Sequence, residues 1–117
     1  MTNKKEVGAW GETIAANWLT ERGCEIVARN VRTPYGEIDI VAQEDDLTLF
    51  VEVKTRASKS LGPPEISITP RKQRHMLAAA EYFAAECGID HWQIDVIAVE
   101  GKPGGAKPAI TRFENAI

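Results

Sequence analysis

Two strand patterns joined by an acidic turn place the strongest limit on the fold of this 117-residue chain. Residues 37–43 and 48–55 are rich in β-branched and apolar side chains, and residues 44–47 between them read as a turn. A tight turn about Asp45 and Asp46 pairs residues whose numbers sum to 91. One face of this hairpin is then apolar, since Ile38, Ile40 and Ala42 lie opposite Val53, Val51 and Leu49. We expect an antiparallel hairpin with that face in the core.

The other face of the predicted hairpin carries charge. In the same register Asp39 lies opposite Glu52, and Glu37 lies opposite Lys54. Like charges directly opposite each other destabilise a sheet, and a broken local rule points to function. Carboxylates bind Mg²⁺, so we expect Asp39 and Glu52 to hold Mg²⁺ or Mn²⁺, with Lys54 acting on an attacking water. The alternative is a solvated strand face with a Glu37–Lys54 ion pair.

The rest of the chain predicts a single α/β domain over residues 1–117. Apolar periodicity indicates a helix over residues 6–22 and a second helix beginning at Pro70 and ending before Gly88. In the second helix the expected buried residues are Met76, Leu77, Ala80, Phe83, Ala84 and Cys87. Further strands are expected at residues 24–29, 92–99 and 109–113, with loops at 30–35 and 56–69. This order predicts a mixed central sheet flanked by helices.

Basic residues gather directly after the second strand of the hairpin. The net charge is −3, which by itself argues against a polyanionic partner, yet residues 54–75 hold six Lys or Arg and one acid. We expect the basic residues of this segment to lie around the carboxylate pair, in the loop and on the first turns of the second helix. There they would bind a nucleic-acid backbone, with DNA favoured over RNA, through Arg56, Lys59, Arg71, Lys72, Gln73 and Arg74. A solvated basic face is the alternative.

Two further features concern the setting of the protein. Cys24 and Cys87 lie in unrelated segments, which favours a reduced, cytoplasmic environment and small buried side chains in place of a disulfide. No apolar stretch is long enough to span a bilayer, so we expect no membrane partner.

Several motifs together resemble the YraN-like family of uncharacterised bacterial proteins. The matching segments are Gly8-Ala9-Trp10-Gly11-Glu12, Asn30-Val31-Arg32, Gly36-Glu37-Ile38-Asp39, Phe50-Val51-Glu52-Val53-Lys54-Thr55-Arg56, Lys72-Gln73-Arg74 and Asn115-Ala116. The resemblance implies a restriction-endonuclease-like three-layer core, similar to archaeal Holliday-junction resolvases and tRNA endonuclease-like domains. One departure is Gln93-Ile94-Asp95, where the family tends to have Arg-Phe-Asp.

The resemblance also bears on the site. It implies that Asp39, Glu52 and Lys54 form an Asp…Glu-x-Lys nuclease signature and that Glu12, an ordinary boundary glutamate on spacing alone, is a further metal ligand. Resolvase-like enzymes cut as two-fold dimers, so a homodimer is an expectation. The main hypothesis is a metal-dependent endonuclease acting on DNA or structured nucleic acid. Two alternatives remain open: a non-catalytic nucleic-acid-binding module, and a metal-dependent enzyme acting on small phosphate compounds.

Overall fold

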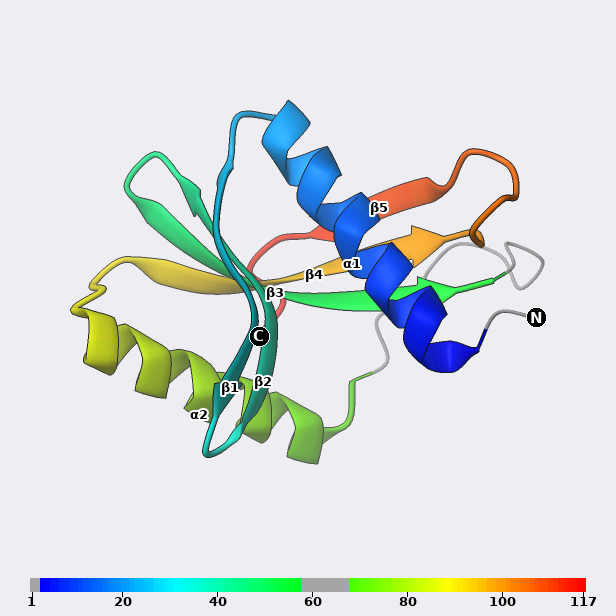
Figure 1. Cartoon of the computed structure of the whole chain (residues 1–117). Coiled ribbons are helices and arrows are strands. Elements are labelled where there is room, and N and C mark those ends of the chain that lie inside the picture. Colours follow the sequence, from blue (N-terminus) through cyan, green and yellow to red (C-terminus); the bar gives the residue numbers. More distant parts are fainter. Residues whose placement is uncertain (1–2, 58–67) are drawn as a thin grey trace.

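In the part of the chain that the structure describes, a five-stranded sheet carries one helix on each face (Figure 1). The computed structural model describes residues 3–57 and 68–117. The elements are α1 (Lys4–Glu21), β1 (Glu25–Thr33), β2 (Gly36–Glu44), β3 (Leu47–Arg56), α2 (Pro70–Cys87), β4 (Trp92–Glu100) and β5 (Ala109–Phe113). The strands lie in chain order; β3 and β4 are parallel and the other neighbours antiparallel. This confirms the predicted mixed sheet between helices and is compatible with a restriction-endonuclease-like three-layer core.

Both helices begin at the residues that capping chemistry favours. The Asn3 side chain accepts a hydrogen bond from the Glu6 backbone N–H at the start of α1, at 2.9 Å. Thr69 does the same for Lys72 at the start of α2, where Pro70 occupies the first helical position. Among residues 3–57 and 68–117, no helix is both long and apolar enough to cross a membrane.

Two apolar clusters hold the helices to the sheet. On one face Ala15, Ala16 and Leu19 of α1 pack with residues that include Ile40 and Val51. On the other face the buried side of α2 packs with β2, β3 and β4, through Met76, Ala79, Ala80, Ala84, Val41, Phe50, Ile94 and Val96. Most of the buried residues of α2 are therefore alanines.

The prediction for the buried face of α2 was partly wrong. Leu77 is 40% exposed and Cys87 is exposed, whereas Ala79, which the sequence pattern did not select, is buried. The buried side of α2 therefore includes fewer of the large apolar residues than the periodicity suggested, and it consists mainly of alanines.

The predicted hairpin register holds near the turn and fails from Asp39 onward. β2 and β3 pair with residue numbers that sum to 91 from Glu44↔Leu47 to Ile40↔Val51, and the paired ladder ends there. The expected pairs Asp39–Glu52 and Glu37–Lys54 do not form, and Ile38 packs in the α2 cluster instead of beside Ile40. β2 instead stays paired with β1, which continues to Thr33 through most of the predicted loop. The two strands of the hairpin therefore part at Asp39.

Close packing of α1 on β3 fixes the position of the first helix. Gly11 is buried, and a Cβ atom added there would clash with the hydroxyl of Thr55. Only glycine allows the helix to approach β3 this closely. Because Glu12 is the next residue, this contact also determines where the Glu12 carboxylate lies.

Candidate active site

Four carboxylates converge where β2 leaves β3. Oxygens of Glu12 on α1 and of Glu37 and Asp39 on β2 all lie within 4.8 Å of one another. Glu52 on β3 is close enough for its charge to raise the pKa of both Asp39 and Glu12. We call Glu12, Glu37, Asp39 and Glu52 the acidic cluster. It draws side chains from three elements that are distant in sequence.

Asp39 is the central member of the acidic cluster. One of its carboxylate oxygens accepts a hydrogen bond from the Val53 backbone N–H at 2.8 Å, which fixes the side chain between the two parting strands. Burial, which is the largest cause, and the charges of Glu52, Glu12 and Glu37 together raise the pKa of Asp39 from its ordinary value of 3.8 to about 7, although the Val53 hydrogen bond opposes the rise. A cation bound here would offset the cost of burying the Asp39 charge and the repulsion between Asp39 and the neighbouring carboxylates.

Asn30 links two of the acids. With its amide nitrogen turned towards them, Asn30 donates to Glu12 at 2.8 Å and to Glu37 at 3.0 Å. The residue adopts a left-handed backbone conformation with φ of 52°, which asparagine tolerates better than most residues. Burial raises the pKa of Glu12, and Arg29, whose guanidinium lies 4.0 Å away, opposes that rise. The amide and the guanidinium thus offset part of the local negative charge.

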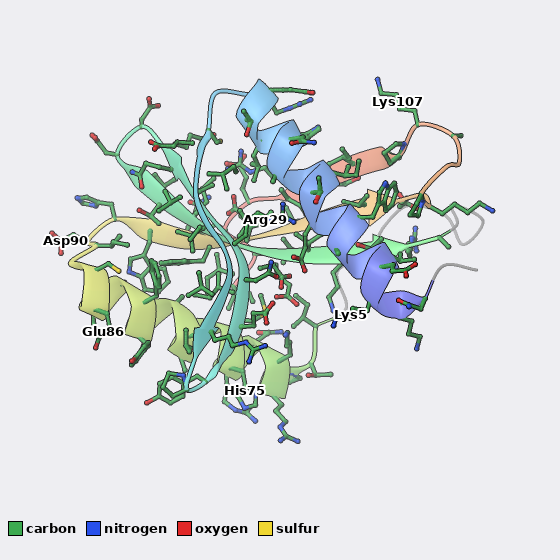
Figure 2. All side chains as sticks on the ribbon, in the orientation of Figure 1. Lys5, Arg29, His75, Glu86, Asp90 and Lys107 are labelled. Carbon is green, nitrogen blue, oxygen red and sulfur yellow. The ribbon has the colours of Figure 1, made fainter. Side chains whose placement is uncertain are left out.

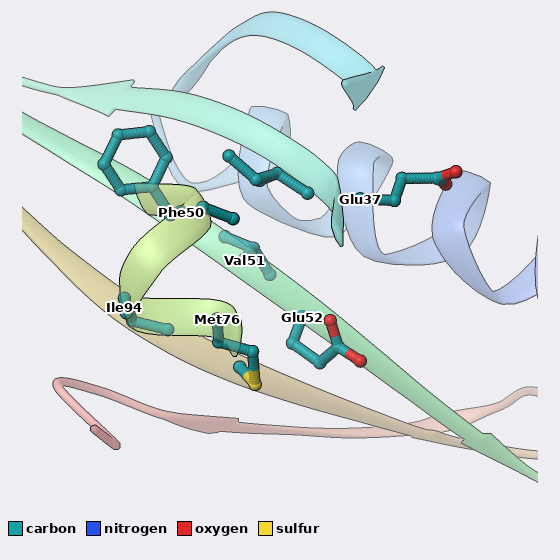
Figure 3. Close-up of a pocket in the computed structure, with 8 residues that line it drawn as sticks. Glu37, Phe50, Val51, Glu52, Met76 and Ile94 are labelled. Carbon is teal, nitrogen blue, oxygen red and sulfur yellow. The ribbon is translucent and has the colours of Figure 1, made fainter. Parts of the chain in front are cut away.

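Glu52 joins the cluster to α2. Its carboxylate pairs with the ammonium of Lys72 at 3.3 Å, and the Glu52 side chain is only 12% exposed. Figure 3 shows Glu37 and Glu52 at a small pocket of about 20 Å³. The rest of the lining is largely apolar: Ile38, Phe50, Val51, Met76, Ala79 and Ile94. Glu37 and Glu52 therefore border a small recess whose other walls are apolar.

The basic residues expected on and after β3 have different surroundings. Lys54 lies two residues beyond Glu52 and is exposed, and no ion pair forms at Lys54 among residues 3–57 and 68–117. Arg56 pairs with the buried Glu100 of β4 at 2.8 Å. Lys59 lies outside the described residues. Lys54 is therefore the basic side chain of β3 that is open to a ligand beside the cluster.

The basic residues expected on α2 lie in its first turns. Arg71 and Arg74 are exposed, Lys72 pairs with Glu52, and the Gln73 amide donates to the backbone carbonyl of Ile68 at 2.9 Å. Lys72 thereby brings the basic start of α2 against the acidic cluster, as the charge distribution predicted.

Two members of the site were missed from the sequence. Glu37 was placed on the same face as Asp39 but was not predicted as a metal ligand, and only the alternative interpretation gave it a role, in an ion pair with Lys54. Asn30 was placed in a loop; its contact with Glu12 depends on β1 continuing as a strand and on a left-handed φ, which the sequence does not reveal.

A separate charged network includes Gln93, where the chain departs from the family pattern. Asp95 is fully buried and pairs with Arg112 of β5 at 2.8 Å, while Arg112 also reaches Glu44 at 3.3 Å. The Gln93 amide and the Asn115 backbone N–H both donate to Asp95. Gln93 thus supports a buried ion pair that ties the end of the chain to β4.

Comparison with known proteins places the chain in one family. A family model described as "Uncharacterised protein family UPF0102" matches residues 11–99. A UPF0102 protein of Syntrophotalea carbinolica is 44% identical over 112 residues, covering 94% of this chain and 89% of the relative. One from Dehalococcoides mccartyi is 37% identical over 118 residues, covering 98% and 95%, and one from Rhodococcus jostii is 43% identical over 102 residues, covering 85% and 86%. The chain therefore belongs to the UPF0102 family, the YraN-like family that its motifs resemble.

Proposed function

We propose that this protein is a Mg²⁺- or Mn²⁺-dependent endonuclease that hydrolyses phosphodiester bonds in DNA or structured nucleic acid. The observation that carries the proposal is the convergence of Glu12, Glu37 and Glu52 on Asp39, whose pKa is raised to about 7. Such a cluster destabilises the metal-free fold, and perturbed carboxyls in a pocket are typical of functional sites.

The donor set fits a hard divalent cation. Mg²⁺ prefers carboxylate oxygens and usually keeps water and substrate phosphate in its remaining positions. Asp39 and Glu52 would hold the ion, with Glu12 or Glu37 completing the protein ligands. When bound, the ion would lower the pKa of the attacking water and stabilise the negative charge that develops on the phosphate.

The chain's own residues would do the rest. The Val53 N–H holds the Asp39 carboxylate in place, so the carboxylate need not move when a ligand binds. Lys54, exposed two residues beyond Glu52, would orient the attacking water or donate to the phosphate oxygen on which charge develops. Arg71 and Arg74 would hold the neighbouring phosphates.

The test is cleavage by matched variants. Wild type, Asp39→Asn, Lys54→Ala and the turn variant Asp46→Asn are incubated with labelled duplex, single strand, four-way junction and the matching RNA, with Mg²⁺, Mn²⁺ or EDTA. We expect metal-dependent cleavage by wild type and Asp46→Asn, and a loss of at least a hundredfold in the other two, since each removes a group that acts directly on the reaction.

Other results identify other functions. Cleavage that survives in both Asp39→Asn and Lys54→Ala would come from a different site or a contaminant. Salt-sensitive binding of DNA with no Mn²⁺ uptake by calorimetry and no cleavage would favour the non-catalytic binding module. Nucleotide hydrolysis without affinity for DNA would favour an enzyme acting on small phosphate compounds.

A further inference from the structure

An exposed pair of tyrosines lies where the turn between β1 and β2 meets α2. The rings of Tyr35 in this turn and Tyr82 on α2 are 6.1 Å apart between centroids and meet at 64°, edge to face. Tyr35 is 51% exposed and Tyr82 is 38% exposed. Figure 1 shows the end of the β1–β2 hairpin crossing α2. An edge-to-face pair covers at most one ring face, so aromatic surface stays open to solvent.

The pair continues a basic stripe along α2. At about 100° per residue, Arg71, His75 and Tyr82 fall within about 40° of one another on the helix surface. All three are exposed, and the stripe is about 16 Å long at 1.5 Å per residue. Arg71, Arg74 and His75 form no ion pair within the described part of the chain.

Charge divides α2 into two halves. Its first five residues after Pro70 are Arg71, Lys72, Gln73, Arg74 and His75, and no acid occurs before Glu81. Figure 2 shows His75 projecting from the first half of the helix and Glu86 from the last turn. An anionic strand lying on the stripe would therefore end at Tyr82, because Glu86 follows one turn later.

Both ends of the stripe are connected to the acidic cluster. Tyr35 is two residues before Glu37, which places their Cα atoms at most about 7 Å apart. At the other end Lys72, next to Arg71, pairs with Glu52 at 3.3 Å. Each end of the stripe is thus linked through a neighbouring residue to one carboxylate of the acidic cluster.

We propose that Tyr35 and Tyr82 form a stacking platform for an unpaired base of the nucleic-acid substrate, whose phosphates lie along Arg71 and His75. This inference rests on the proposed endonuclease function and assigns its substrate class: nucleic acid with a single-stranded segment next to the cleavage site. Aromatic rings beside a basic groove are the usual means of holding single strands, because every base offers a π face. A continuous duplex keeps its bases stacked inside and gains nothing from the platform.

The test separates the rings from the charges. All variants carry Asp39→Asn, which prevents cleavage, and bind three labelled oligonucleotides: single-stranded dT, the same strand with abasic sites, and a hairpin duplex. Tyr35→Leu keeps an apolar contact with Tyr82 but has no π face, whereas Tyr35→Trp keeps one. Leu77→Ala removes an exposed apolar side chain from α2 about 140° away from Tyr82 and is the matched control. Thermal melting checks that every variant is folded.

Stacking is worth about 1–3 kcal/mol per base, so Tyr35→Leu should weaken binding of single-stranded dT by about tenfold. Its binding to the abasic strand and the duplex should stay unchanged, and Tyr35→Trp and Leu77→Ala should bind like the parent. Equal losses on all three oligonucleotides, or no loss with Tyr35→Leu while the wild type still cleaves DNA, would overturn the platform and leave the endonuclease proposal standing. If the parent binds no nucleic acid and the wild type cleaves none, both proposals fail.

Discussion

The Asp39 carboxylate accepts a hydrogen bond from the Val53 backbone N–H at 2.8 Å, just beyond the last β2–β3 pair, Ile40↔Val51. A side chain thus satisfies a backbone donor that the parting of the strands would leave unpaired. The same contact fixes the carboxylate at the centre of the acidic cluster. The Asp39–Val53 hydrogen bond therefore accounts both for how the hairpin tolerates the parting of its strands and for where the Asp39 carboxylate lies.

Asp39 should make stability depend on pH. Its pKa is about 7 in the folded protein and near 3.9 in an unfolded chain, so the folded state binds the proton more tightly. The stabilisation of the folded state by this bound proton is fully present below about pH 4 and is lost as the pH rises through about 7. Asp39→Asn stays neutral, so without metal it should be more stable than wild type by about 1–2 kcal/mol at pH 8, after allowance for screening by water at the exposed rim.

Urea denaturation in EDTA at pH 4.5 and pH 8 measures this difference. The advantage of Asp39→Asn should be smallest at pH 4.5, and Asp46→Asn in the exposed turn should show no such dependence. A wild type that is as stable as Asp39→Asn at pH 8 would mean that Asp39 is not destabilised by its surroundings.

Glu37 should contribute to metal binding, although it was not among the ligands predicted from the sequence. Its carboxylate lies within 4.8 Å of those of Glu12 and Asp39, so Glu37→Gln removes a negative charge beside the ion. We expect Mn²⁺ to bind about tenfold more weakly, a loss of about 1.4 kcal/mol, as measured by calorimetry. Glu25→Gln, at the exposed start of β1, is the matched control and should bind Mn²⁺ normally. An unchanged affinity in Glu37→Gln would exclude Glu37 from the ligand set.

The sequence predicted what depends on local pattern. Alternation and turn chemistry gave the hairpin register as far as Ile40↔Val51, and the distribution of charge placed Lys72 beside the carboxylates. The parting of the strands at Asp39 and the contact of Asn30 with Glu12 were not predictable. Both depend on hydrogen bonds between residues distant in sequence and, for Asn30, on a left-handed φ.

The contact between Gly11 and Thr55 should affect the site through the position of α1. Gly11→Ala forces α1 and β3 apart, so we expect a loss of about 1–3 kcal/mol in the free energy of unfolding and weaker Mn²⁺ binding through Glu12. Adding Thr55→Ala removes the clashing hydroxyl and should restore part of both.

A second glycine of the same helix provides the control. Gly8 has open space where a Cβ would lie, so Gly8→Ala should stabilise the protein by about 0.5–1 kcal/mol and leave Mn²⁺ binding unchanged. If Gly11→Ala is as stable as Gly8→Ala, the close approach of α1 to β3 is not required.

Lys72 should compete with the metal for Glu52. The two side chains pair at 3.3 Å, and Lys72 remains 43% exposed, so Lys72→Gln leaves more negative charge for the ion at little cost to the fold. Mn²⁺ affinity should rise by about two- to fivefold, while DNA affinity falls and its salt dependence decreases by about one phosphate contact. Lys107→Gln is the control, since Lys107 is exposed and lies far from α2 (Figure 2). If Lys72→Gln weakens Mn²⁺ binding instead, Lys72 supports the bound ion and does not compete with it.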